Sequence, residues 1–189
     1  MDYLLLPFVE LEVRFGTQTE KYFDSSIDKN YFEKIKNVLD TGDFVIHEIE
    51  TEEYIKDNLK LSNQSIQLKE NVFTKKITTN FAFDFKLSVN QEFNLNSYLN
   101  SFSKENCIIR NKKRRSYISH NFKYDLTSVI QKEDGINKSK YELEIELLVN
   151  KETLLWNNDF INIFLECKMY DIINIVEPMS REDFKINLF

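Results

Sequence analysis

The chain has 189 residues, of which 42% are hydrophobic and 30% are charged, a balance that excludes a disordered chain and fits one folded domain. The net charge of −6 argues against a protein that binds nucleic acid by bulk attraction, although it allows a local basic site inside an acidic shell. With 16 Phe and 9 Tyr, the composition favours a fold rich in β-strands.

Cysteine usage and apolar runs indicate the compartment. Cys107 and Cys167 form no CxxC pair, so they predict no disulfide framework and fit a reducing environment. The opening segment MDYLLLPFVELEV has an apolar run too short for a signal sequence, and no other run reaches the length needed to span a bilayer. We therefore expect a soluble, intracellular protein.

The first half of the chain is predicted to hold strands around one helix. Residues 4–15 form a strand, and residues 27–40 form a helix that Ser25 or Ser26 caps. Residues 52–60 form a strand or a short helix. Strand-like patterns also cover 64–71, 71–78 and 83–93. Residues 43–51 form a strand as well.

The second half continues with strands and ends on a helix. Residues 94–102 are predicted to be a loop or short helix, and a turn over 131–140 centres on Asp134 and Gly135. Strands are predicted at 106–119, 120–130 and 141–149, and helical spacing covers 158–175. Consecutive antiparallel strands with helices near both ends indicate an α+β fold with a large sheet or barrel.

Two strands carry rows of glutamates on one face. Side chains of a strand point alternately to its two faces, so residues two apart share a face. The rows are Glu10, Glu12 and Arg14 in VELEVRFG, and Glu142, Glu144 and Glu146 in YELEIELL. The ordinary interpretation of either row alone is a solvated strand face. Like charges stacked on one pleated face repel, however, so two unmixed acidic rows indicate a site for a divalent cation.

Three other strands also have one polar face. IIRNKKRRSYI places Arg110, Lys112 and Arg114 on one face, or Lys113 and Arg115 on the other, and such a run is equally typical of a solvated or nucleic-acid-facing patch. The remaining two rows are Lys86, Ser88, Asn90 and Glu92, and Lys123, Asp125 and Thr127. If these strands close into a barrel with the charged faces inward, the rows must pair with each other, with a metal and with an anion. The composite predicts a lumen that binds a polyanion together with a divalent cation.

Taken in order, these segments resemble the triphosphate tunnel metalloenzymes, and most closely the metal-dependent RNA 5′-triphosphatases that begin mRNA capping in fungi, protozoa and large DNA viruses. The segments that carry the resemblance are VELEVRFG, TKKI, DFKLSVNQEF, RNKKRRSY, DLTSV and YELEIEL. Two positions depart from the family pattern: Arg14 stands where a lysine is usual, and SIQLKENV offers only Lys69 where the family has a phosphate-binding arginine. The composition also suggests a giant-virus enzyme.

The resemblance implies a closed antiparallel eight-stranded β-barrel with flanking helices. It implies metal-dependent hydrolysis of the γ-phosphate from the 5′-triphosphate end of nascent mRNA, the first step of cap formation, and hydrolysis of nucleoside triphosphates with Mn²⁺. Glu10, Glu12 and Glu146 would hold Mg²⁺ or Mn²⁺. Glu92 and Glu144 would orient the attacking water, while Lys112 and Arg114 stabilise charge on the phosphoryl group. Phosphate-binding residues would be Arg14, Lys69, Lys75 or Lys76, Lys86 and Arg110, supported by Asp125, Thr127 and Glu142.

The same resemblance implies an organisation and partners. Residues 1–189 would be a single triphosphatase domain, the N-terminal part of a larger capping enzyme, which acts with or is fused to an RNA guanylyltransferase and works in the virion or host cytoplasm. Two alternatives stay open: a small-molecule triphosphatase that acts on thiamine triphosphate or tripolyphosphate, and a non-catalytic module that binds polyanions or RNA. Nothing in the sequence indicates a membrane partner.

Overall fold

The computed structural model describes residues 3–63, 65–133, 135–186 and 188. Within these residues, one sheet of nine strands has the order β2-β1-β6-β5-β4-β3-β7-β8-β9, and β1 also pairs with β9. This last pairing closes eight strands into a barrel and leaves β2 outside it. The pairings are antiparallel throughout the described ladders. The predicted closed eight-stranded antiparallel barrel with flanking helices is confirmed.

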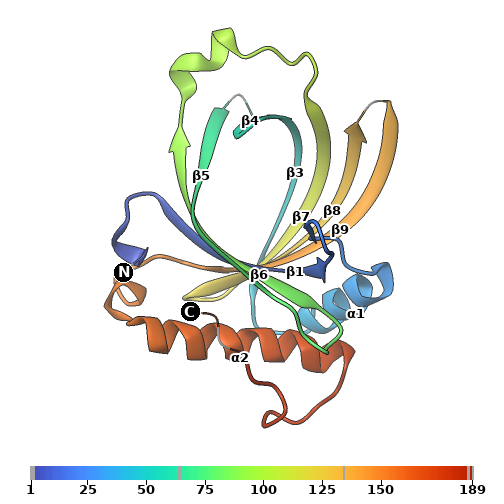
Figure 1. The fold of residues 1–189 in the computed structure, drawn as a ribbon, viewed down its shortest axis with the longest axis vertical. Coiled ribbons are helices and arrows are strands. Elements are labelled where there is room, and N and C mark those ends of the chain that lie inside the picture. The colour runs from blue at the N-terminus through green and yellow to red at the C-terminus, as the bar shows by residue number, and fades with distance from the viewer. Residues whose placement is uncertain (1–2, 64, 134, 187, 189) are drawn as a thin grey trace.

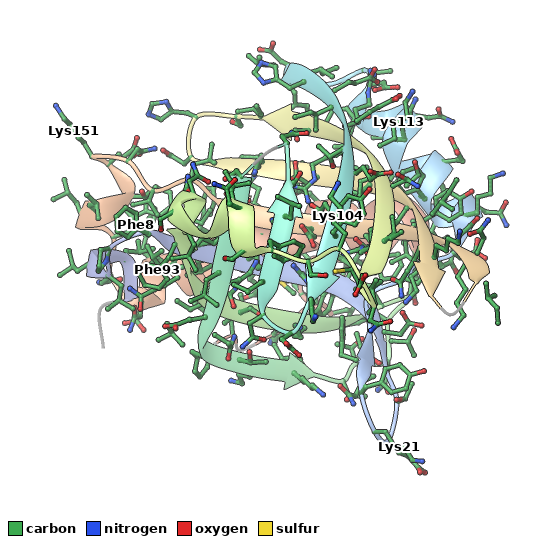
Figure 2. The ribbon with its side chains drawn as sticks, turned by 90° about the horizontal axis from the view of Figure 1, so that it is seen from above. Phe8, Lys21, Phe93, Lys104, Lys113 and Lys151 are labelled. Carbon is green, nitrogen blue, oxygen red and sulfur yellow. The ribbon has the colours of Figure 1, made fainter. Side chains whose placement is uncertain are left out.

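Figure 1 shows the strands rising from a base formed by helix α2, with α1 beside β9. The strands are β1 (Val9–Gln18), β2 (Phe23–Asp24), β3 (Val45–Lys56), β4 (Leu59–Ser62), β5 (Ser65–Ile77), β6 (Asp84–Asn94), β7 (Ile108–Ile118), β8 (Phe122–Glu133) and β9 (Ile136–Leu147). The helices are α1 (Lys29–Leu39), α2 (Asn158–Val176) and three short 3₁₀ helices, η1 (Tyr3–Leu5), η2 (Asn96–Ser101) and η3 (Thr153–Leu155).

The hydrophobic core lies outside the barrel, between its wall and the two helices. Along β1, the side chains of Leu11, Val13 and Phe15 are buried on the face opposite the glutamates. They belong to the same core cluster as Leu165 and Met169 of α2. Because β1, β6, β8 and β9 each have one apolar and one polar face, packing their apolar faces into this core turns their polar faces into the lumen.

Several element boundaries differ from the sequence prediction. The predicted strand over 4–15 begins only at Val9, because η1 precedes it and Phe8 has a left-handed φ of 55°. Helix α1 is capped by Asp28, whose side chain accepts a hydrogen bond from the backbone N–H of Asn30 at 2.7 Å; the prediction that Ser25 or Ser26 caps it was wrong. The predicted helix over 158–175 is confirmed as α2.

The middle of the chain is more continuous than predicted. The strands predicted at 43–51 and 52–60 are one strand, β3, followed by a turn at Asp57 and the short β4. The separate strands predicted at 64–71 and 71–78 are likewise one strand, β5, with an irregular register between Asn71 and Phe73. A β-bulge admits an extra residue without ending a strand, which the alternation pattern alone does not show. The turn between β8 and β9 includes Gly135 with φ of 79°, whereas Asp134 lies outside the described residues.

The C-terminal end of α1 is tied to the outer face of β7. The hydroxyl of Tyr117 donates a hydrogen bond to Asp40 at 2.7 Å, and Arg115 pairs with the same carboxylate at 2.8 Å. Tyr117 and Arg115 alternate along β7 with the charged residues of its inner face. These contacts therefore fix the strand that carries the basic row of the lumen.

Substituting Leu165 by Ala tests whether α2 supports the barrel. Leu165 is 0% exposed, so the change leaves a cavity under the strands and should lower the free energy of unfolding by about 2–5 kcal/mol. Ile163→Ala in the same helix is the control, because Ile163 is 57% exposed and its loss should cost less than about 1 kcal/mol. Urea denaturation followed by circular dichroism measures both. Equal losses would contradict the packing described here.

Candidate active site

The barrel encloses a charged cavity of about 550 Å³. Its acidic lining residues are Glu10, Glu12, Glu53, Asp57, Glu92, Glu142, Glu144 and Glu146, and its basic ones are Arg14, Lys60, Lys69, Arg110, Lys112, Arg114 and Lys123. Ile55, Asn58, Leu59 and Gln67 complete the wall. The acidic and basic side chains nearly balance in number, so they can pair with one another. When such ion pairs open, the cavity can admit an anion together with a cation.

The glutamates of β1 share one lysine. The ammonium group of Lys69 contacts Glu10, lies 3.3 Å from Glu12 and lies 3.7 Å from Glu92. Glu12 is 3% exposed and also accepts a hydrogen bond from Asn90 at 3.3 Å. Burial raises the pKa of Glu12, against the opposing charges of Arg14 and Lys69. Additional positive charge near Glu12 would therefore stabilise its ionised carboxylate.

The glutamates of β9 differ from one another in their surroundings. Burial alone would raise the pKa of Glu144, but the charges of Arg14 and Arg114 outweigh it and lower that pKa to about 2. Burial raises the pKa of Glu146 to about 7, although Lys123 lies 2.8 Å away. Glu144 is therefore a fixed anion between two arginines, whereas Glu146 is short of compensating charge.

The basic row of β7 points into the cavity and pairs with acidic residues of other strands. Arg110 lies 2.6 Å from Glu142, and Lys112 lies 2.9 Å from Glu53 of β3. Burial and the neighbouring charge of Arg110 lower the pKa of Lys112. Alternation left the inward face of this strand open, and the family resemblance predicted the face with Arg110, Lys112 and Arg114, which is the face that lines the cavity.

Asp125 of β8 organises the middle of the lumen. Its carboxylate lies 3.1 Å from Arg114 and 3.3 Å from Lys123, and it accepts a hydrogen bond from Ser116. Thr127 accepts a second hydrogen bond from Arg114 at 3.3 Å. Asp125 and Thr127 do not line the cavity, but they hold side chains that do.

Three predicted phosphate-binding lysines lie away from the cavity. In the register of the sheet, Lys86 of β6 lies opposite Arg14 of β1 and opposite Lys76 of β5. These three residues therefore share the inner face, at the end of the barrel that is farther from β4. Lys75 pairs with Leu87, which is buried in the outer core, and therefore lies on the outer face. Of the two candidates, only Lys76 is on the side of the lumen.

Sequence reasoning gave no site role to Glu53 or Lys123, both of which line the cavity. Lys123 shares a strand face with Asp125, so the alternation already placed it there. Glu53 was missed because residues 52–60 were treated as a separate element. Read as one strand from Val45, β3 places Glu53 and Ile55 on one face, and Glu53 lies directly opposite Arg110 in the register.

The donors expected for a divalent cation come from strands that are hydrogen-bonded to each other. Glu12 and Glu146 are direct partners in the β1–β9 ladder, and Glu10 follows on the same face of β1. Carboxylate oxygens suit Mg²⁺ and Mn²⁺. Among the described residues, no three acidic, histidine or cysteine side chains converge on one point as they stand. Lys69 and Lys123 hold these carboxylates instead, so the donor set fits such a cation once these lysines turn aside.

Comparisons with known proteins show what the chain is similar to. Residues 77–161 match the family model described as the beta chain of the mRNA capping enzyme, a segment that runs from the end of β5 into α2. The structure of S. pombe Pct1 RNA triphosphatase superposes with a TM-score of 0.58 at 20% identity, covering 77% of this chain and 74% of that one. The structure of Pct1 in complex with the Spt5 CTD gives 0.66 at 16% identity, covering 94% and 90%. No curated protein gives a significant match.

The barrel, its inward charged rows and these matches give the described residues the fold of the Pct1 structures. More particularly, the resemblance to the RNA triphosphatases of mRNA capping is confirmed. The giant-virus origin stays a prediction. Neither helix found among the described residues is long and apolar enough to cross a membrane.

Replacing Asp125 by Asn tests the central ion-pair cluster. Asp125 is 1% exposed, and its loss of charge leaves Arg114 and Lys123 without their shared counter-ion, which should lower the free energy of unfolding by about 3 kcal/mol. Glu50→Gln is the control: Glu50 pairs with Lys113 on the outer face, where the side chains are 73% and 61% exposed. Its effect should stay below about 1 kcal/mol in urea denaturation. A cost at Asp125 no larger than at Glu50 would show that the cluster does not stabilise the barrel.

Proposed function

We propose that this chain hydrolyses the γ-phosphate from the 5′-triphosphate end of RNA, the first step of cap formation, with Mg²⁺ or Mn²⁺ as cofactor. The observation that carries the proposal is the pairing of β1 with β9, which sets Glu12 opposite Glu146 inside a cavity that the basic row of β7 also lines. The match to the capping-enzyme family model supports RNA as the substrate.

The basic residues would bind and orient the phosphates. Arg14 of the adjacent strand β1 reaches Glu144 at 2.9 Å, and Arg114 reaches it at 3.7 Å from β7, on the far side of β8. When a triphosphate enters, their guanidinium groups can exchange part of this contact for phosphoryl oxygens, which they recognise in a planar, two-point geometry. Lys112 supplies a third charge from β7. In phosphoryl transfer, such positioning and charge neutralisation account for most of the catalysis.

Glu144 and Glu92 would orient the attacking water. Because the pKa of Glu144 is lowered to about 2, its carboxylate is ionised at neutral pH and acts as a hydrogen-bond acceptor for a water molecule. Asp125 and Thr127 keep Arg114 in place, and Glu142 keeps Arg110 in place. Glu10, Glu12 and Glu146 would hold the divalent cation, which supplies Lewis-acid polarisation of a phosphoryl oxygen when bound.

We extend the proposal to free nucleoside triphosphates with Mn²⁺ and to a guanylyltransferase as partner, within or beside a longer capping polypeptide. Both extensions rest on the family resemblance. The tunnel contacts are mostly ion pairs between acidic and basic side chains, which suit a phosphate chain and a cation. They therefore support the phosphate chemistry more directly than the choice between RNA and a small triphosphate.

Glu12→Gln and Glu146→Gln test the proposal. Each change keeps the side-chain size but removes a negative charge from the expected cation site, so both should lower phosphate release from triphosphate-ended RNA at least ~100-fold. Both should also weaken Mn²⁺ binding, measured by electron paramagnetic resonance of the free ion, independently of turnover. Glu48→Gln, on the outer face of β3, is the matched control and should leave both measurements unchanged.

The same assays separate the alternatives. Faster release from tripolyphosphate or thiamine triphosphate than from RNA would replace RNA by a small molecule as the substrate. Anion binding without hydrolysis of any triphosphate in the parent protein would favour a non-catalytic module. Either result would contradict the function proposed here, whereas hydrolysis that persists fully in Glu12→Gln would contradict the assigned cation site.

A further inference from the structure

A second cavity, the rim pocket, adjoins the charged tunnel. It has a volume of about 390 Å³ and is lined by Lys56, Asp57, Leu59, Ile66, Leu95, Ser101, Phe102 and Ser103. Asp57, in the turn between β3 and β4, and Leu59, the first residue of β4, line both this pocket and the tunnel cavity. The two cavities are therefore neighbours across one rim of the barrel.

The rim pocket lies on the outer side of the barrel wall. Lys56 and Leu59 are direct partners in the β3–β4 ladder, on the face opposite to the tunnel residues Ile55 and Lys60. The other wall is the connection from β6 to β7, which arches over the top of the barrel and includes η2 (Figure 1). The backbone N–H of Leu95 donates a hydrogen bond to the carbonyl of Ile66 at 2.8 Å, which ties this connection to β5.

The chemistry of the rim pocket contrasts with that of the tunnel. Leu59, Ile66, Leu95 and Phe102 make its walls apolar, and Ile66 is buried at the bottom. Lys56, Asp57 and two serine hydroxyls stand among them. Ligand pockets of roughly 300–1,000 Å³ typically combine apolar walls with a few polar groups in this way. The charged tunnel suits phosphates, whereas the rim pocket suits a flat, mostly apolar ring.

We propose that the rim pocket binds the base of the first nucleotide while its triphosphate occupies the tunnel, an inference that rests on the function proposed above. A nucleotide has this division of chemistry: a polyanionic chain joined through a ribose to an aromatic ring. The half-buried ring of Phe102 provides a surface on which a base stacks. Lys60, on the tunnel side of the rim, faces the α-phosphate, and Asp57 accepts a hydrogen bond from a ribose hydroxyl.

The rim pocket should tolerate different bases. Base–aromatic stacking depends on the π-face that every base has, and among the described lining residues only the serine hydroxyls, Lys56 and Asp57 offer polar contacts. The main consequence is a preference for triphosphates that carry a nucleoside over inorganic tripolyphosphate. The tunnel residues alone give no reason for such a preference, because they meet only phosphate.

Phe102→Ala tests the proposal by a comparison of two substrates in the full chain. The KM for triphosphate-ended RNA should rise roughly 5- to 150-fold, which corresponds to the stacking contribution of ~1–3 kcal/mol per base. The KM for inorganic tripolyphosphate should not change, because that substrate has no base. Phe102→Trp should restore the KM for RNA, since its ring stacks at least as well. Tyr22→Ala, at an exposed tyrosine before β2, is the matched aromatic control and should behave like the parent.

A binding measurement separates failure of this proposal from failure of the proposed function. A triphosphate-ended oligonucleotide with 2-aminopurine as its first base should lose fluorescence on binding to the parent protein, because the probe stacks, and should keep it with Phe102→Ala. If the parent hydrolyses no triphosphate, the function is wrong, and this titration still decides whether the pocket takes a base. An unchanged fluorescence in the parent, or equal rises in KM for RNA and tripolyphosphate, would overturn the pocket assignment and leave it to an occupant other than a nucleotide.

Discussion

The architecture of the lumen depends on the hydrogen-bonded pairing of β1 with β9. These strands lie near opposite ends of the sequence, and their ladder sets Glu12 opposite Glu146 and Arg14 opposite Glu144. Like charges directly opposite in a sheet are destabilising, so closure of the barrel at this seam requires compensating cations. Lys69 comes from β5 and Lys123 from β8, so the cations arrive from both sides of the seam. The two glutamate rows lie side by side on the inner face because the barrel closes at this pair of strands.

The barrel is charged inside and apolar on the outer face that the helices cover, and this distribution makes the lumen possible. The apolar faces of the strands pack outward against α1 and α2, and the structure therefore gains its hydrophobic stabilisation without filling the barrel. The helices also set the position of the charged strands: Asp40 at the end of α1 binds Tyr117 and Arg115 on the outer face of β7. The side chains on the other face of that strand, among them Lys112, are thereby directed into the lumen. Support of the barrel and placement of the basic row are two consequences of one packing arrangement.

Much of the site follows from alternation alone, because period two assigns each charged residue of a strand to a face. That rule correctly grouped Glu10 with Glu12, and Asp125 with Thr127. It does not determine register, and so the sequence did not distinguish Lys75 from Lys76: the irregularity in β5 between Asn71 and Phe73 changes which residues meet across the sheet. Glu53 was missed for a related reason, since residues 52–60 were predicted as a separate strand or short helix, and the local pattern did not show that β3 continues to pair Glu53 with Lys112. Long-range pairing decided both cases, and a local pattern carries no information about it.

The row of glutamates in β9 shows how one residue type acquires two properties. Glu144 lies between Arg14 and Arg114, which keep it ionised, whereas Glu146 has one lysine partner and a pKa raised to about 7. Glu144 is buried whereas Glu146 is partly exposed, so depth alone would raise the pKa of Glu144 more, and the observed difference comes from their neighbours. A carboxylate held between two arginines is suited to orienting a water molecule, because its charge and position are fixed. A carboxylate that lacks compensating charge is suited to a cation, because binding one relieves the cost of its burial. The strand thus places on one face, two residues apart, a carboxylate that would accept a hydrogen bond from water and a carboxylate that would hold a cation.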